Sequence, residues 1–200
     1  LILNAGGPVE LTDILEQTDN IKGILNISQL GQEGGDALAD VLLGKEVPGG
    51  KLTTTWARRY EDYPASEEYG YLNGNLEKEK YKEGIYVGYR YFETFSKEKA
   101  LFPFGYGLSY SNFDIEVLDF KADNDKIKVE VRVTNIGDVA GKEVVELYAN
   151  APQGKLSKPV MSLVAFDKTI NLEPKESQKI TLEVPVYLLA SFDDTGATGH

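Results

Sequence analysis

Cysteine is absent from the 200 residues of this sequence, and histidine, tryptophan and methionine occur once each. Without cysteine the chain can form neither a disulfide bond nor a thiolate metal site. The one histidine is the last residue, His200, and a single imidazole cannot build a histidine cluster around a metal ion. We therefore expect no metal site. The compartment stays open, because both a cytoplasmic and a secreted protein fit this composition.

The sequence also lacks long apolar runs and clusters of basic residues. No run approaches the roughly 20 residues that span a bilayer, and the N-terminus lacks the basic-then-apolar pattern of a signal peptide, so we expect no membrane partner. Lysine and arginine number 21 against 32 aspartates and glutamates, which gives a net charge of -11. A surface that binds nucleic acid needs clustered lysine and arginine, so this composition argues against a nucleic-acid partner. A neutral sugar is indifferent to that charge.

Apolar residues are plentiful and make up 42% of the chain. At this length they are enough to bury a core in one or two domains, so the composition is typical of a globular chain. The sequence begins with Leu1 and not with methionine, so we expect it to be a piece of a longer protein.

Residues 1–58 have the pattern of a parallel α/β layer. Residues 1–5 form a short apolar run that ends at a Gly-Gly-Pro turn, and residues 21–27 are a second candidate for a buried strand. Each run is followed by a helical pattern, and a strand-helix-strand-helix order predicts parallel strands. Two such units cannot cover both faces of a sheet, so we assign this region to the edge of a larger α/β sandwich domain.

The two helical patterns differ in strength. The first rests on three apolar residues at helical spacing, which are Leu11, Ile14 and Leu15. The second predicts an amphipathic helix over residues 36–43 that ends at Gly44. Its expected inward residues are Ala37, Leu38, Val41 and Leu42.

Residues 59–108 form a connector in this interpretation, because from Val47 to about Phe104 the sequence shows turns, tyrosines and charges without a sustained period. We expect it to be long and extended. A connection of this length with little regular structure wraps a surface or lines a site. Packing at a domain interface is the favoured interpretation, because aromatic side chains bury much area there at modest entropic cost. The aromatic residues concerned are Tyr81, Tyr86, Tyr89, Tyr91, Phe92 and Phe95.

Residues 109–200 have the pattern of an antiparallel β-sandwich. Polar and apolar residues alternate over 113–117 and over 127–133, and the Asn-Ile-Gly sequence at 135–137 indicates the turn that follows. Strands at regular spacing with turn signals between them are typical of such a sandwich. The further predicted strands are 144–149, 162–170 and 178–184.

Three stretches in fixed order carry a resemblance to a known family. They are residues 31–35 (GQEGG) running into 47–52 (VPGGKL), then 81–92 (YKEGIYVGYRYF), then 101–110 (LFPFGYGLSY). Together they resemble the C-terminal half of glycoside hydrolase family 3, the β-glucosidases and their relatives. The resemblance covers nearly the whole chain, to about Asp194, and three ordered matches are far more specific than one short motif.

The resemblance implies that the parent protein is a retaining β-glycosidase. Such an enzyme removes a terminal non-reducing sugar from an oligosaccharide or other glycoside, and no metal or organic cofactor is implied. It uses a nucleophilic carboxylate and an acid/base carboxylate about 5 Å apart. In the family the nucleophilic aspartate lies on an N-terminal barrel, and the acid/base glutamate lies upstream of the strand that residues 1–5 match. Neither motif is present, so we predict no catalytic residue here, an inactive fragment, and a missing barrel domain as its partner.

The resemblance also implies that the predicted sandwich is fibronectin type III-like (immunoglobulin-like). In the family a closing hairpin follows the region that residues 189–193 resemble. We therefore expect the sandwich at 109–200 to lack its last strands, or a second segment to complete it. Residues 191–200 look similar to a branch of the family in which the barrel comes last, whereas the usual order places the barrel before Leu1. Both orders stay open.

Gln32 and Glu33 are the candidates for substrate contact in the first region, because they follow the second predicted strand. Open α/β sheets bind ligands at the carboxyl ends of their parallel strands. Gly34 and Gly35 would allow a close approach of the backbone, while the two polar side chains could hydrogen-bond to hydroxyl groups. In the alternative interpretation, Glu33 lies in the first turn of the helix and satisfies free N–H groups and the helix dipole.

Glu83 and Arg90 are the candidates in the connector. They could face a sugar, because aromatic rings beside them can stack on pyranose rings and a guanidinium can donate to hydroxyl groups. In the alternative interpretation they pair with each other or with the missing barrel. The single tryptophan, Trp56, ends a strand-like segment, where it is either buried or a platform for a sugar.

A second hypothesis makes the predicted sandwich a non-catalytic carbohydrate-binding or protein-interaction module, since β-sandwiches host many unrelated functions. The main candidates for exposed aromatic residues on its strands are Tyr148 and Phe166. A polysaccharide-binding face needs a planar row of such residues, which disfavours this hypothesis. The sequence identifies neither the sugar nor the linkage nor the number of subunits.

Overall fold

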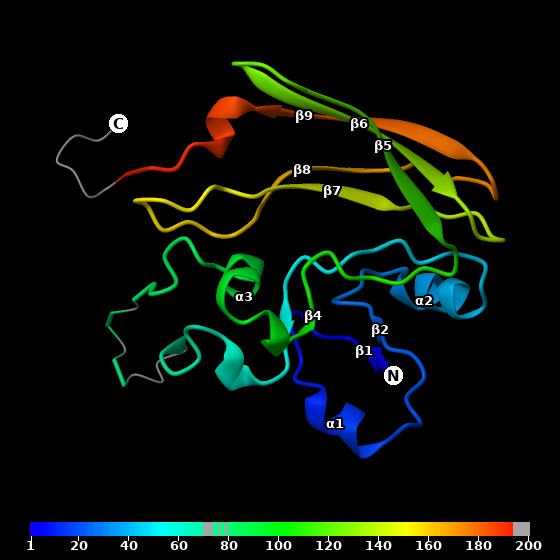
Figure 1. Ribbon diagram of the computed structural model, residues 1–200. Helices are drawn as coiled ribbons and strands as arrows, with labels where there is room; N and C mark the ends of the chain where they lie inside the picture. Colours follow the sequence, from blue (N-terminus) through cyan, green and yellow to red (C-terminus); the bar gives the residue numbers. More distant parts are fainter. Residues whose placement is uncertain (70–73, 76, 79, 194–200) are drawn as a thin grey trace. The chain divides into compact units, whose positions relative to one another are not determined.

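The computed structural model describes residues 1–69, 74–75, 77–78 and 80–193. The chain divides into two compact units, and the ribbon of Figure 1 carries the labels of their elements. The first unit comprises residues 1–46 and 52–106, and the second comprises 47–51 and 107–200. No helix within the described ranges is long and apolar enough to cross a membrane.

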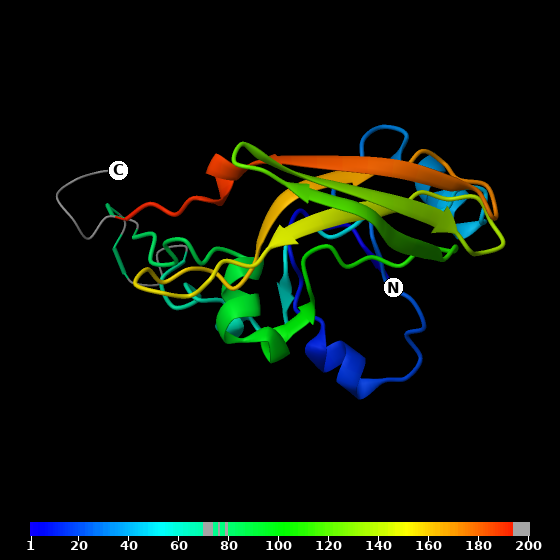
Figure 2. The ribbon, with the colours of Figure 1, turned by 45° about the horizontal axis from the view of Figure 1, so that its top comes forward.

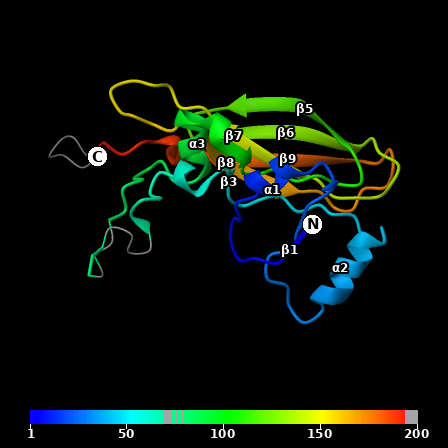
Figure 3. The ribbon, with the colours of Figure 1, turned by 90° about the horizontal axis from the view of Figure 1, so that it is seen from below.

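The first unit begins with the predicted order of strands and helices. Its first elements are β1 (Ile2–Leu3), α1 (Thr12–Gln17), β2 (Leu25–Asn26) and α2 (Gly34–Leu42). The two strands are parallel, with Ile2 opposite Leu25. The prediction of parallel strands in this region is therefore confirmed, and the loop that joins β2 to α2 can be followed in Figure 3.

Glycines limit α2 at both ends. A Cβ on Gly34 would overlap the Cβ of Leu30, so the first helical residue has no room for a side chain. Beyond the last turn, Gly44 has a φ of 72°, a left-handed conformation that glycine adopts at low cost. Its N–H donates to the Val41 carbonyl over 3.1 Å. The predicted end of the helix at Gly44 is confirmed.

The predicted inward face of α2 is wrong in part. Leu38 and Val41 are half-buried as expected, but Ala37 is exposed and Leu42 keeps 58% of its surface exposed. The apolar periodicity is real, yet in the described part of the first unit nothing packs over the Leu42 side of the helix. Burial requires a second layer, which a periodic pattern alone does not supply.

The connector has more regular structure than its sequence predicts. It contains η1 (Tyr60–Asp62), α3 (Tyr89–Phe95), η3 (Lys97–Lys99) and β4 (Ala100–Phe102). β4 pairs antiparallel with β3 (Trp56–Ala57), which precedes the predicted limit at residue 58. The prediction of an extended segment is therefore wrong for α3 and its neighbours, because aromatic contacts that show no periodicity hold them in place.

These aromatic contacts join residues of the first unit that lie far apart in the sequence. Tyr63 and the fully buried Phe92 meet edge to face, with 5.7 Å between ring centroids. Trp56 packs edge to face against Phe102 at 6.4 Å. Such pairs contribute about 0.5–1.5 kcal/mol each beyond the area that they bury. Further ring contacts join Tyr91 to Phe92 and Phe95, Tyr86 to Phe95, Tyr89 to Phe104, and Phe102 to Tyr106.

The second unit contains the predicted strands in two antiparallel sheets, which Figure 2 shows in a tilted view. The strands are β5 (Phe113–Ala122), β6 (Lys126–Asn135), β7 (Val144–Ala149), β8 (Ser162–Lys168) and β9 (Ser177–Pro185), and η4 (Val186–Leu189) follows them. One sheet has the order β5-β6-β9, and the other pairs β7 with β8. Aliphatic residues of β6, β7 and β9 share one core with Leu172.

Asn135 ties the end of β6 to three other segments. It is fully buried, and its amide oxygen accepts hydrogen bonds from the Ser111 hydroxyl (2.7 Å) and the Gly137 N–H (3.0 Å). Its amide nitrogen donates to the carbonyls of Val139 and Leu172, both at 2.8 Å. The turn predicted at residues 135–137 is thus confirmed, and its asparagine is a core residue.

β5 has an apolar face that remains uncovered. Val117 and Phe120 lie opposite Val131 and Val129 of β6, so all four point to the core side of the sheet. The two β6 valines are buried, whereas Val117 keeps 65% and Phe120 keeps 62% of its surface exposed. The opposite sheet, as far as the chain is described, therefore covers β6 and the start of β5 at Phe113, and it leaves Val117 and Phe120 uncovered.

Every strand of the second unit has at least one partner among the described residues, yet β5, β7, β8 and β9 each pair with only one strand and so have a free edge. The pairing of every described strand fits a complete sandwich, whereas the free edges fit an incomplete one. The expectation that residues 109–200 lack their last strands therefore stays a prediction. The last part of the segment that resembles the permuted branch, residues 194–200, lies outside the described residues.

Candidate functional site

The loop between β2 and α2 holds the first two candidate residues. Gln32 and Glu33 lie in the turn before α2, both are exposed, and Glu33 is the N-cap residue of the helix. The predicted position of Glu33 at the start of the helix is confirmed. Its side chain makes no capping hydrogen bond within the described part of the chain, so the expectation that it satisfies free N–H groups is wrong.

The same loop contains two residues that the sequence analysis missed. Ser28 has a φ of 50°, which is uncommon for a residue with a Cβ and costs conformational energy. Its N–H donates to the side-chain oxygen of Asn26 over 3.3 Å, an Asx-type turn that an asparagine two residues earlier could have indicated. The Gln29 side chain lies against Gly6, where a Cβ would come within 3.3 Å. The loops after β1 and β2 thus lie against each other at this point.

Glu83 and Arg90 lie at either side of a glycine turn in the connector. Glu83 is half-buried, and its carbonyl accepts a hydrogen bond from the Tyr86 N–H over 2.9 Å. Arg90 lies in the first turn of α3, with its guanidinium carbon 5.6 Å from the centre of the Tyr89 ring. No ion pair joins Glu83 to Arg90 in the described chain, so the expected pairing with each other is wrong. Pairing with another domain stays a prediction.

Trp56 is buried, with 4% of its surface exposed. It lies in β3 against Phe102, and the neighbouring residues Thr55 and Ala57 are buried as well. The interpretation of Trp56 as a buried residue is confirmed, and its interpretation as a platform for a sugar is wrong.

The shifted pKa values of the described carboxyl groups do not suit a catalytic acid. Hydrogen bonds from Lys128 and Lys179 lower the pKa of Glu130 to about 2. A hydrogen bond from Lys121 lowers the pKa of Asp119, and backbone N–H groups lower that of Asp123. A glycosidase acid needs a raised pKa. No group of three or more acidic, histidine or cysteine residues in the described ranges could hold a metal ion.

Tyr63, in the first unit, is a half-buried tyrosine with a shifted pKa. Burial raises the pKa of Tyr63, whose hydroxyl donates to the Thr55 carbonyl (3.2 Å) and accepts from the Ala57 N–H (3.1 Å). Both partners lie at β3, so the tyrosine fixes this strand to η1. Its perturbation reflects packing and not a reactive site.

Comparison with known families defines the class of the chain. The description "Glycosyl hydrolase family 3 C-terminal domain" matches residues 1–89, and "Fibronectin type III-like domain" matches residues 143–198. The resemblance to glycoside hydrolase family 3 is thereby confirmed, with the α/β part first and the fibronectin type III-like part second.

The similar proteins are β-glucosidases. The chain is 45% identical to Beta-glucosidase A of Butyrivibrio fibrisolvens over 98% of its own length and 25% of that protein, and 42% identical to a β-glucosidase of Ruminococcus albus over 100% and 20%. The structure of β-glucosidase 3B from Thermotoga neapolitana in complex with glucose superposes with a TM-score of 0.89 and 45% identity, over 96% of this chain and 26% of that one. The chain thus spans a fifth to a quarter of these relatives.

Proposed function

We propose that this chain is part of a retaining β-glycosidase of the β-glucosidase type that hydrolyses terminal non-reducing sugar residues. The observation that carries the proposal is the match to β-glucosidases over nearly the whole chain and in both of its domains. In this enzyme the chain supplies scaffold and domain interface. Its partners are the barrel domain of the same protein and a neutral glycoside or oligosaccharide substrate.

The role of interface accounts for apolar surface that the first unit leaves exposed. Ile85, Val87 and Phe95 in the connector and Leu42 on α2 each expose more than half of their surface. Exposed apolar patches of this kind mark interaction sites in soluble proteins. We assign them to contact with the missing parts of the α/β domain and with the barrel.

The experiment compares the natural gene product with the 200-residue chain. Both are assayed for hydrolysis of 4-nitrophenyl β-glucoside, and the intact mass of the natural product is measured. We expect a much larger, active natural product and an inert 200-residue chain, because a retaining mechanism needs two carboxyl groups that this chain does not provide. Hydrolysis by the 200 residues alone would overturn the proposal.

Gln32, Glu33, Glu83 and Arg90 are the positions at which we propose that the chain reaches the substrate. Glu33 carries the strongest argument, because its exposed side chain lies at the carboxyl ends of parallel strands and makes no capping bond within the described chain. Glu33→Gln in the natural product should raise KM more than it lowers kcat. Glu16→Gln, which changes an exposed residue of α1, is the matched control. Equal kinetic constants for both variants would remove Glu33 from the site.

We also propose that the two sheets form a fibronectin type III-like sandwich that further strands complete. The support is the uncovered apolar face of β5 together with the free edge of β7. A pair of strands added to β7 would extend the second sheet across β5. Burying an aliphatic or phenylalanine side chain stabilises a fold by about 1.5–3 kcal/mol, so strands that covered Val117 and Phe120 would stabilise the sandwich.

The second candidate function, a carbohydrate-binding or interaction module, rests on Phe166. This residue of β8 is largely exposed, whereas the hydroxyl of the half-buried Tyr148 donates to Glu146 over 2.7 Å. One exposed ring on a strand is a poor platform for a polymer. Binding of the 200-residue chain to insoluble cellulose or xylan, abolished by Phe166→Ala, would favour this candidate over the scaffold.

A further inference from the structure

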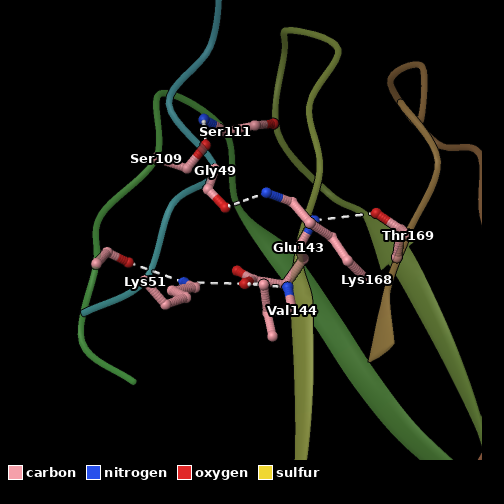
Figure 4. Close-up of polar contacts among 9 residues, drawn as sticks. Gly49, Lys51, Ser109, Ser111, Glu143, Val144, Lys168 and Thr169 are labelled. Atoms are coloured by element: carbon pink, nitrogen blue, oxygen red, sulfur yellow. Dashed lines mark hydrogen bonds and ion pairs between the residues drawn. The ribbon is translucent and has the colours of Figure 1, made fainter. Parts of the chain in front are cut away.

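Residues 47–51 belong to the second unit, although the residues on both sides of them belong to the first. The segment connects α2 to β3, and in sequence it is separated from the rest of its unit by more than 50 residues. Figure 4 shows the polar contacts that hold it on the loop before β7. Such a placement needs specific interactions, because a five-residue segment buries little apolar surface of its own.

An ion pair provides the main contact. The Lys51 ammonium lies 2.9 Å from a carboxylate oxygen of Glu143 and donates a second hydrogen bond to the Gly107 carbonyl over 2.8 Å. The two side chains keep only 19% and 15% of their surface exposed. Exposed pairs contribute little, but breaking a pair that is largely withdrawn from water leaves one charge without compensation.

Contacts other than the ion pair also hold Glu143 in position. Its backbone exchanges two hydrogen bonds with the buried Thr169, at 2.9 and 3.0 Å. The same carboxylate oxygen that pairs with Lys51 accepts the Val144 N–H over 2.7 Å. A carboxylate fixed in this way loses little further entropy when the lysine binds.

Two glycines allow the backbones to meet at this point. A Cβ on Gly107 would overlap the Gly50 carbonyl oxygen, and a Cβ on Gly49 would come within 2.9 Å of the Lys142 carbonyl oxygen. The Gly49 carbonyl also accepts a hydrogen bond from the Lys168 ammonium over 2.6 Å. Close backbone contact therefore explains one glycine in each of two stretches, Gly49 in VPGGKL and Gly107 in FGYGL.

We propose that Lys51 and Glu143 form a lock that makes residues 47–51 a fixed part of the second unit. The lock anchors the chain that leaves α2, so that this connection cannot open as a flexible linker while the ion pair is intact. The inference stands on the contacts of the second unit and is independent of the enzymatic activity proposed above.

Cleavage by the lysine-specific protease Lys-C tests the lock in the natural gene product. Lys51 cannot enter the protease while its ammonium is bound, whereas Lys45 is largely exposed and serves as an internal reference. Glu143→Gln removes the charge but keeps an acceptor for the Val144 N–H. It should raise the cleavage rate after Lys51, relative to that after Lys45, by about tenfold through local opening.

The controls separate the lock from general loosening. Glu130→Gln removes another lysine-paired glutamate of the second unit and should leave the ratio unchanged. Lys168→Met removes only the contact to the Gly49 carbonyl and should raise the ratio by a smaller factor. Should Glu143→Gln fail to fold, Lys51→Met removes the same ion pair from its other side, and amide exchange of Leu52, whose N–H donates to Tyr106, is compared between the wild type and Lys51→Met. An unchanged cleavage ratio in folded Glu143→Gln, or unchanged exchange in Lys51→Met, would overturn the proposal.

Discussion

Replacing Asn135 with alanine should destabilise the second unit by about 3 kcal/mol, because it removes hydrogen bonds of a fully buried amide. The amide joins the end of β6 to Ser111, to the following turn and to the segment around Leu172. Few single residues of the unit connect so many segments, which makes this the sharpest test of how the structure is held together.

The size of this loss of stability depends on which hydrogen bonds the partners of Asn135 keep in the variant. The Leu172 carbonyl still accepts the Gly141 N–H at 3.1 Å, and the carbonyl of Val139 and the N–H of Gly137 are only partly buried, so water can replace the lost bond. The Ser111 hydroxyl, in contrast, is buried and loses its acceptor. A stranded buried group costs about 1–3 kcal/mol, and the remaining bonds add about 1 kcal/mol in net terms.

Amide exchange of β6 and β9 in the natural gene product measures this cost, because these strands form the centre of the core. Ser111→Ala is the matched control and should cost about 1 kcal/mol, since it removes one bond and leaves the amide otherwise satisfied. The double variant should cost less than the sum of both, because no hydroxyl is then stranded. A loss below about 1 kcal/mol in Asn135→Ala, or strict additivity, would refute this reasoning.

Three further predictions concern the sheets and α2. Lowering the pH should cost stability through Glu130: its pKa of about 2 lies below the ordinary value of 4.5, so the stabilisation is present above that value and is lost as the pH falls toward 2. Glu130→Gln should therefore flatten the acid side of a plot of Tm against pH, and an unchanged plot would contradict the assignment. Gly34→Ala should cost about 1–3 kcal/mol in urea unfolding because its Cβ overlaps Leu30, whereas Gly35→Ala, which faces open space, should gain up to about 1 kcal/mol. Phe120→Ser should change the stability of the 200-residue chain by less than about 0.5 kcal/mol but should lower the Tm of the natural gene product, and equal effects on both would argue against a cover over β5.

The strands of the second unit could be predicted because one face of each is apolar. The alternation over residues 127–133 corresponds to β6, whose valines are buried at every second position. β5 runs to Ala122, five residues beyond its predicted end at 117. The second half of the strand was not predicted because the register shifts between Val117 and Asp119. The extra residue, Leu118, interrupts the alternation and hides the second half of the strand from a search for period two.

The candidate site was harder to predict than the strands. The position of Glu33 followed from the order of strand and helix, but the absence of a capping bond depends on the geometry of a single turn. Ser28 and Gln29 were missed because a left-handed serine and a side chain packed on a glycine leave no periodic trace. In the connector, α3 depends on contacts such as that between Tyr63 and Phe92, which are 29 residues apart and so lie beyond any local pattern.

The disagreements between pattern and burial share one physical cause. Leu42 on α2 occupies a position that the helical repeat assigns to the interior, and Phe120 on β5 lies opposite the buried Val129 of β6, yet both side chains are exposed. Random surface leucines and phenylalanines would not fall on the apolar face of a helix and of a strand at once. We therefore infer that a further layer packs on each of the two elements. The related β-glucosidase of Butyrivibrio fibrisolvens is about four times as long as this chain, and we propose that the corresponding additional segments supply both layers. If Leu42→Ser and Phe120→Ser both destabilise the natural gene product and neither destabilises the 200-residue chain, the two faces are interfaces of a larger enzyme.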